Sequence, residues 1–246
     1  MSNESTSQLE QHCAQFGAVN VTALSKIQKV VAQRMHASWS AIPHVTHNDD
    51  AVIDTLNHAR RALSERIDKK ITPLPYLVKA AAQTLKAHPV FNASLDTDSG
   101  NLIFKQYYNI GVAVNTPNGL MVPVIANADN KSIPSIADEI VEDAENARTK
   151  GLPMSKMVGG CFTISSLGSI GGTSFTPIIN APEVAIMGIC TATEKPIRRD
   201  NDIVWQTTLP LSLSYDHRVI NGADAAAFCR TFADFLASPD TLEQEG

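Results

Sequence analysis

The stretch Ser212-Leu-Ser-Tyr-Asp-His-Arg-Val-Ile-Asn-Gly222 decides how the fold of this chain is interpreted. A short apolar run places His217 at the end of a predicted strand, and the segment ends at Gly222. Imidazole titrates close to neutral pH, so a histidine at such a strand end is a candidate general base. The alternative is a histidine held in the core for structural reasons. This segment alone leaves both interpretations open.

The run Asp216-His-Arg-Val-Ile-Asn-Gly222 resembles the HxxxDG-type signature of the dihydrolipoamide acyltransferases, the E2 components of 2-oxoacid dehydrogenase complexes. Other stretches fit the same family, in its order: Ala32-Gln-Arg-Met35 with Ser38-Trp39, Ile42-Pro-His-Val-Thr46, Asn109-Ile-Gly-Val-Ala-Val-Asn-Thr-Pro-Asn-Gly-Leu-Met-Val-Pro123, Phe162-Thr-Ile-Ser-Ser-Leu-Gly168 and Asn180-Ala-Pro-Glu-Val-Ala-Ile186. The resemblance covers roughly residues 20 to 237. It implies the α/β fold of chloramphenicol acetyltransferase, a mixed sheet flanked by helices.

The composition is that of a globular chain with one core. Its 246 residues are 43% hydrophobic and 18% charged, which allows a single domain of this length. A net charge of -5 and a pI near 5.8 give no reason to expect nucleic acid, and no basic run suggests a membrane surface. The polar start and the lack of a long apolar stretch predict a cytoplasmic protein without a signal or transit peptide.

No metal site is expected. The cysteines lack a CxxC spacing, so most of the four are expected to be small buried residues: Cys13, Cys161, Cys190 and Cys229. His44 and His47 invite a metal interpretation, but residues three apart on an extended segment point to opposite faces. The segment SLGSIGGT contains no GxGxxG and does not follow the pattern of a dinucleotide site.

The chain divides into an arm and one domain. Residues 1–20 lack periodicity and are rich in Ser, Gln and Glu, which predicts a flexible N-terminal arm unless a partner subunit holds it. Residues 21–246 form the acyltransferase catalytic domain that the resemblance implies. The lipoyl domain and the peripheral-subunit-binding domain of longer family members are not found in this sequence.

Apolar spacing and turn chemistry predict the elements. Helices are expected from Ser25 to before Pro43, from about Asp54 to Ile67, from an N-cap at Thr72 with Pro73 in the first turn to near His88, from Ser132, and from Gly222 to Leu236. Strands are expected between Leu102 and Asn127, with a hairpin turn at Pro117-Asn118-Gly119, and over 161–166, 183–191 and 203–215.

The helix that opens at Ser132 carries many acidic residues. Its apolar side is expected to hold Ile136, Ile140, Val141 and Ala144. Glu139, Glu142, Asp143 and Glu145 lie mostly on the other side, and this acidic run is interpreted as a solvated face.

The resemblance implies direct transfer of an acyl group from the S8 thioester of acyl-dihydrolipoamide to coenzyme A. His217 matches the family's general base, which would take the proton of the coenzyme A thiol. Ser165 matches the hydroxyl that stabilises the oxyanion. The alternatives are that Ser165 bonds local backbone or that its neighbour Ser166 is the donor.

Asn221 stands where many family members have aspartate and some acetyl-specific members have asparagine. Its amide can orient a neighbour at the catalytic site or cap the helix that begins at Gly222. Asp216 and Arg218, on either side of His217, are expected to form a structural pair that points away from the base.

The coenzyme A contacts implied by the resemblance are Arg60, Thr72, Ser165 and Ser166. Asn115 stands where some relatives have aspartate, which leaves that contact open. Arg60 would meet phosphate or adenine, whereas an exposed helical arginine is often merely solvated.

The resemblance also implies partners: a homotrimer with its site between subunits, a lipoyl group on a separate domain or protein, and the E1 and E3 components. The tail from Ser238 is acidic with one large apolar residue. We therefore expect an isolated trimer that associates only weakly with other trimers across two-fold contacts. The expected acyl group is acetyl, in a pyruvate or acetoin dehydrogenase complex. The alternatives are a free O-acetyltransferase like chloramphenicol acetyltransferase and a non-catalytic scaffold.

Overall fold

A computed structural model describes residues 7–117 and 119–243. Seven strands form one mixed sheet in the order β1-β11-β9-β8-β4-β7, with β10 paired to β11. β8 runs parallel to β4 and β9, and the other pairs are antiparallel. The strands are β1 (His44–Val52), β4 (Ile110–Val112), β7 (Val124–Ile125), β8 (Phe162–Ser166), β9 (Ala185–Ile189), β10 (Thr193–Arg199) and β11 (Asp202–Asp216).

Two short hairpins lie beside this sheet. One pairs β2 (Ala93–Asp96) with β3 (Asn101–Phe104), and the other pairs β5 (Val114–Thr116) with β6 (Gly119–Met121). Thr116 pairs with Gly119, which confirms the predicted hairpin; Asn118 of its turn lies outside the described residues.

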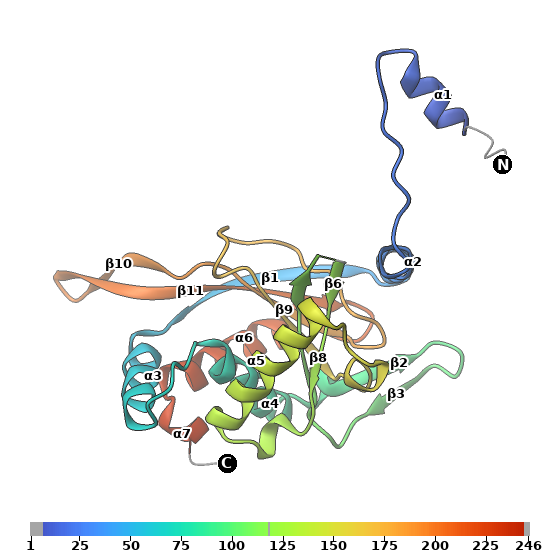
Figure 1. Ribbon diagram of the computed structural model, residues 1–246. Coiled ribbons are helices and arrows are strands. Elements are labelled where there is room, and N and C mark those ends of the chain that lie inside the picture. The colour runs from blue at the N-terminus through green and yellow to red at the C-terminus, as the bar shows by residue number, and fades with distance from the viewer. Residues whose placement is uncertain (1–6, 118, 244–246) are drawn as a thin grey trace.

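From α3 onward the helices pack against one face of the sheet, as Figure 1 shows, whereas α2 lies beside β6. The ring of Phe228 stacks between two others at the centre of this layer. Its centroid lies 4.2 Å from that of Phe91 and 5.4 Å from that of Phe162. Such aromatic contacts add to the burial energy of the core. The helices are α2 (Lys26–Ala41), α3 (Asp54–Arg66), α4 (Leu74–Ala87), α5 (Ile133–Thr149), α6 (Gly222–Ala237) and the short α7 (Asp240–Glu243), with 3-10 turns η1 (Pro89–Asn92), η2 (Ala128–Asn130) and η3 (Met154–Lys156).

The chain between β8 and β9 covers the opposite face of the sheet. Phe162 and Ile164 of β8 belong to the core on the helix side, so alternation turns Thr163 and Ser165 to this other face. Phe175 lies across β9, because a Cβ added at Gly188 would come within 2.7 Å of its ring. Any larger residue at position 188 would therefore force the Phe175 ring to move.

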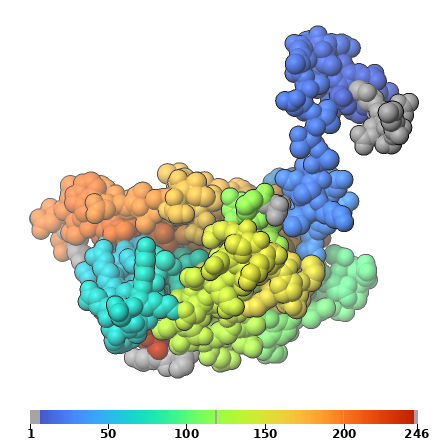
Figure 2. All heavy atoms as spheres, in the orientation of Figure 1, coloured from blue at the N-terminus to red at the C-terminus, as the bar shows by residue number. Residues whose placement is uncertain are grey.

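The N-terminal arm contains a helix that the sequence did not predict. Ser7 Oγ accepts a hydrogen bond from Glu10 N (3.1 Å) and caps α1 (Gln8–Ala14), which buries no residue. Figure 2 shows α1 and the extended segment after it standing clear of the body. Local capping, and not an apolar face, accounts for this helix.

Most predicted elements are confirmed, including the helix capped by Ser25 and the helix that follows Asn221. The predicted N-cap at Thr72 is wrong. Pro73 occupies the N-cap position with helical backbone angles, and no side chain caps α4. Arg60 donates to the Ile71 carbonyl before it, which is not a cap.

The acidic helix also differs from its prediction. Asp143 is buried at 2% exposure and pairs with Lys156, which also contacts Glu139. Val141, placed on the apolar side, is 64% exposed. The two lysines Lys131 and Lys156 approach from outside the helix, so part of the acidic run faces cations and not solvent.

Cys161, Cys190 and Cys229 are buried and Cys13 is exposed, as expected for unpaired cysteines. Among the described helices, none is long and apolar enough to cross a membrane.

Candidate active site

His217 lies in the turn between β11 and α6. Its backbone N–H donates to Pro43 O (3.1 Å), and its ring lies 5.8 Å from the ring of Tyr215. The imidazole is exposed, and within the described residues it has no hydrogen-bond partner. The turn therefore presents the side chain to a group from outside this chain.

The Asp216 carboxylate fixes this turn. Arg218 donates through Nε to Oδ1 (3.0 Å) and through Nη2 to Oδ2 (2.7 Å), and its backbone N–H donates to Oδ1 as well. These hydrogen bonds raise the pKa of Arg218. Asp216 is only 2% exposed, so this bidentate pair is structural, as the sequence predicted.

Asn221 caps α6. Its Oδ1 accepts from the backbone N–H of Ala223 (2.9 Å) and of Asp224 (3.0 Å), and the Asn221 N–H donates to the Asp224 carboxylate (3.5 Å). This capping box sets the direction in which the chain leaves the His217 turn. The capping interpretation of Asn221 is confirmed.

Ser165 and Ser166 end β8 and are both half-buried. Ser166 Oγ accepts from the Gly168 backbone N–H (3.4 Å), which is the local bond considered for its neighbour. The Ser165 hydroxyl has no hydrogen-bond partner within the described residues. Because the Ser166 hydroxyl only accepts in this contact, both serines keep an O–H group that can donate to a ligand.

Ser165 and His217 do not meet within one chain. Ser165 pairs with Gly188 on β9, which pairs with Ser212 on β11, and His217 lies five residues beyond Ser212. Five residues of strand extend about 16 Å and two strand spacings add about 10 Å across, so the two residues are roughly 19 Å apart. One chain alone cannot bring both to the same thioester.

Arg60 and Thr72 lie close together, apart from the two serines. Arg60 is half-buried on α3 and donates through Nη1 to Ile71 O (3.0 Å), next to the exposed Thr72. Arg60 also lines an open cavity of about 440 Å³, whose lining does not include Thr72. Cationic, acidic and hydroxyl side chains line it: Arg60, Arg61, Ser64, Glu65, Asp68, Lys69 and Lys70.

His44 has a structural role. Its Nδ1 faces Ile42 O (2.9 Å) and its Nε2 accepts from Ile179 N (3.0 Å), so both ring nitrogens are occupied. In the described part of the chain, no group of three metal-ligating side chains is found.

Glu183 is the notable residue that the sequence interpretation missed. It is 3% exposed and accepts hydrogen bonds from Thr163. A carboxylate between Pro182 and an apolar strand was the available signal.

The family model for the 2-oxoacid dehydrogenases acyltransferase (catalytic domain) matches residues 17–243. The dihydrolipoyllysine-residue acetyltransferase component of the pyruvate dehydrogenase complex of Cupriavidus necator is 51% identical over 225 residues, which are 90% of this chain and 40% of that protein. This chain thus spans about 40% of the length of that curated relative.

Solved structures agree with this match. One comes from crystallographic and enzymatic work on the role of a serine, a histidine and an asparagine in the catalytic mechanism of Azotobacter vinelandii dihydrolipoamide acetyltransferase; another is the cubic core of the pyruvate dehydrogenase multienzyme complex. Each has a TM-score of 0.90 at 46% identity, covering 94% of this chain and 96% of the other.

A chloramphenicol acetyltransferase shares the fold, with a TM-score of 0.54 at 13% identity, covering 83% of this chain and 94% of the other. The fold expected from the sequence is confirmed. With 227 matched residues spanning the sheet, the His217 turn and β8, the chain belongs to the family of 2-oxoacid dehydrogenase acyltransferase catalytic domains.

Proposed function

We propose that this chain transfers an acetyl group between the S8 thioester of a dihydrolipoyl group and coenzyme A. One observation carries the proposal. The serine, histidine and asparagine studied in the Azotobacter vinelandii enzyme follow one another at intervals of 52 and four positions. Ser165, His217 and Asn221 have the same residue types at the same two intervals.

His217 is the proposed general base. In the direction of acetyl-coenzyme A formation, the imidazole takes the proton of the coenzyme A thiol as its sulfur attacks the thioester carbonyl. The exposed ring has no competing partner in the described chain, which supports this role.

Ser165 is the proposed oxyanion donor. Attack places negative charge on the carbonyl oxygen, and the Ser165 hydroxyl donates a hydrogen bond to it. The tetrahedral intermediate collapses when the bond to the dihydrolipoyl sulfur breaks. The imidazolium of His217 then returns its proton to that sulfur. Because the coenzyme A sulfur attacks the thioester directly, no acyl-enzyme forms.

The site is proposed to form between copies of the chain. The separation of roughly 19 Å between Ser165 and His217, estimated from strand geometry, is too large for one thioester. A homotrimer in which His217 of one copy faces Ser165 of the next would complete the site. Closed cyclic symmetry makes every such interface identical.

Coenzyme A is proposed to reach the cavity beside α3. Arg60 is engaged with Ile71 O, whereas Arg61 and Lys70 on the same cavity are exposed. We therefore expect Arg61 and Lys70 to meet the phosphates, while Arg60 holds the Ile71 carbonyl next to Thr72. Ser165 and Ser166 belong to the reactive end of the molecule.

Acetyl is the proposed acyl group because the curated relatives are named acetyltransferase components of the pyruvate dehydrogenase complex. A pocket distinguishes acyl groups by only about 1–3 kcal/mol per methylene. Acyl preference thus does not identify the parent complex. On the names of the relatives, the pyruvate complex is proposed as the parent, with the acetoin complex as the alternative. The lipoyl domain and the E1 and E3 components would be its partners.

The test is the formation of acetyl-coenzyme A from acetyl-dihydrolipoamide and coenzyme A. We expect turnover by the wild-type protein and loss of nearly all turnover in His217→Ala with the same oligomeric state. His58→Ala, on the exposed surface of α3, is the matched control and should keep full activity. Equal activity of wild type and His217→Ala would reject the general base.

A further inference from the structure

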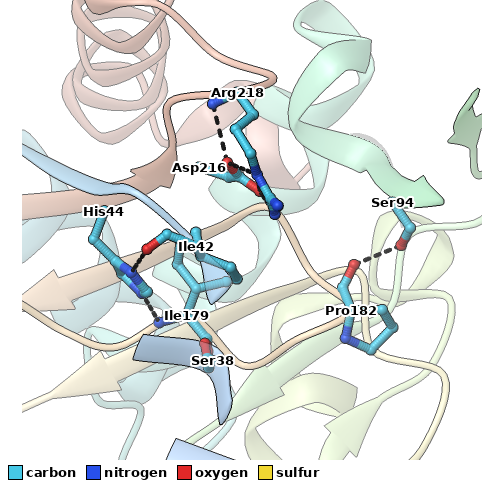
Figure 3. A network of polar contacts seen from close by, with 8 residues as sticks. All are labelled: Ser38, Ile42, His44, Ser94, Ile179, Pro182, Asp216 and Arg218. Atoms are coloured by element: carbon cyan, nitrogen blue, oxygen red, sulfur yellow. Dashed lines mark hydrogen bonds and ion pairs between the residues drawn. The ribbon is translucent and has the colours of Figure 1, made fainter. Parts of the chain in front are cut away.

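The loop of residues 179–184 is held at its start by α2 and β1. Ser38 Oγ donates to Ile179 O (2.6 Å), and Ile179 N donates to His44 Nε2 (3.0 Å). Figure 3 shows His44 between Ile42 and Ile179, bonded to both. Ser38 is buried, so this end of the loop is anchored away from solvent.

The end of the same loop reaches the His217 turn. Asp216 N donates to Val184 O (2.8 Å), and Ser94 Oγ donates to Pro182 O (2.6 Å). His217 directly follows Asp216. The loop is thus fixed to the strand end that delivers the proposed base.

Glu183 joins this loop to β8. Thr163 Oγ1 lies 2.9 Å and 2.7 Å from the two carboxylate oxygens, and Asn180 Nδ2 donates to Oε1 (3.4 Å). The carboxylate is 3% exposed. The bond from Asn180 lies within the loop, and the bond from Thr163 joins the loop to β8; a buried acid makes such a contact stronger than a surface contact would be.

Glycines make close packing around this contact possible. A Cβ at Gly160 would lie 2.8 Å from Glu183 Oε1, and a Cβ at Gly111 would lie 2.9 Å from Thr163 Oγ1. The neighbouring ionisable groups are Lys105 and Cys161. Thr163 and Glu183 therefore have little freedom to separate.

Ser165 lies two residues after Thr163 on β8. Residues two apart on a strand face the same side of the sheet, so the anchored hydroxyl and the proposed oxyanion donor share one face. A shift of β8 along this face would move both side chains together. Misplacement of a catalytic group by about 1 Å can cost about 100-fold in rate.

We propose that Glu183 is a positioning residue, which holds Ser165 in place through its contact with Thr163 and its loop. The inference rests on the proposed function, because Ser165 must act in acyl transfer. Glu183 itself is enclosed by protein and does not touch the substrates.

The test compares two backgrounds. In the wild-type background, Glu183→Gln should lower kcat about tenfold, with unchanged KM for coenzyme A and for acetyl-dihydrolipoamide. Thr163→Val removes the same contact from the other side and should act alike. In the Ser165→Ala background, both substitutions should change kcat by less than about twofold, because the group that they position is gone.

A structural role would give another pattern. If Glu183→Gln lowers kcat by the same factor with and without Ser165, or raises KM alone, the positioning role is wrong. Glu142→Gln, an exposed acid on α5, is the matched control and should have wild-type kinetics. Circular dichroism and the trimer mass identify variants that fold. If Glu183→Gln does not fold, Thr163→Val tests the same contact.

The two proposals can fail separately. If wild type is active but Ser165→Ala keeps its full kcat, the role of Ser165 and with it this inference is rejected. If Ser165→Ala loses about 100-fold while Glu183→Gln and Thr163→Val keep full kcat, the acyl-transfer mechanism stands and the positioning role of Glu183 is rejected.

Discussion

Glu183 is a carboxylic acid that folding removes from water. Burial raises its pKa to about 7, although Thr163, Lys105 and Asn180 act in the opposite direction. Burial of a charge costs free energy that hydrogen bonds only partly offset. The sequence interpretation did not predict this residue, because its burial depends on a contact with Thr163, 20 residues away along the chain.

The raised pKa predicts how stability depends on pH. The folded pKa of about 7 lies above the ordinary value of 4.5, so the folded state binds the proton more tightly than the unfolded state. The contribution of this proton is complete below pH 4.5 and is lost as the pH rises through 7. Its size is about 3 kcal/mol at most.

Urea denaturation at pH 5 and pH 8 measures this effect. Compared with Glu183→Gln, the free energy of unfolding of wild type should fall by up to about 3 kcal/mol between the two pH values. Glu142→Gln should follow wild type at both. A difference between wild type and Glu183→Gln that is constant with pH would contradict the raised pKa.

At the scale of elements, local signals predicted most of the fold. Ser25 and Ser132 both cap helices, and apolar runs predicted β8, β9 and β11. β10 was missed, because its charged and exposed sequence pairs with the outer part of β11 and buries little. The burial of Asp143 could not be predicted from helical spacing, because Lys156 comes from a separate turn.

The α6 capping box makes a prediction for stability. Asn221→Ala removes the acceptor of two backbone N–H groups and should cost about 1 kcal/mol of unfolding free energy. Asn221→Asp keeps an acceptor at the same place and should remain close to wild type. Thermal or urea unfolding of the two variants checks this, and equal stability of Asn221→Ala and wild type would show that the cap contributes nothing.

The candidate site could be predicted from the sequence as residues but not as an arrangement. His217, Ser165 and Asn221 were named from motifs, and their spacing along the chain gives no distance in space. The strand order, with β9 between β8 and β11, and the five residues from Ser212 to His217 together separate Ser165 from His217 within one chain. The whole-molecule question is therefore which copies supply each residue.

Mixed oligomers answer this question. His217→Ala and Ser165→Ala are each expected to be nearly inactive alone. After random co-refolding, about a quarter of the interfaces should combine an intact His217 from one copy with an intact Ser165 from the next. Activity near a quarter of wild type is the expected result, and a mixture as inactive as its two components would place both residues within a single chain.

The C-terminal segment bears on assembly size. Leu242 is fully buried in its own chain, and Glu243 accepts a hydrogen bond from Tyr76 Oη (2.6 Å). Leu242, the large apolar side chain of the tail, is thus packed against its own chain and is not exposed for a contact between trimers. The isolated trimer stays our prediction: light scattering should give about three times 26.5 kDa, and a mass near that of eight or twenty trimers would contradict it.

The ring of Phe175 over Gly188 limits how this protein can vary. Every replacement of Gly188 adds at least a methyl group, which would meet the ring at 2.7 Å, in the row that runs from Ser165 to Ser212. In a library of all single substitutions, few active clones should thus carry a residue other than glycine at position 188. Change there would require the Phe175 ring to move or a smaller residue to replace it, so variation at position 188 should depend on the residue at position 175.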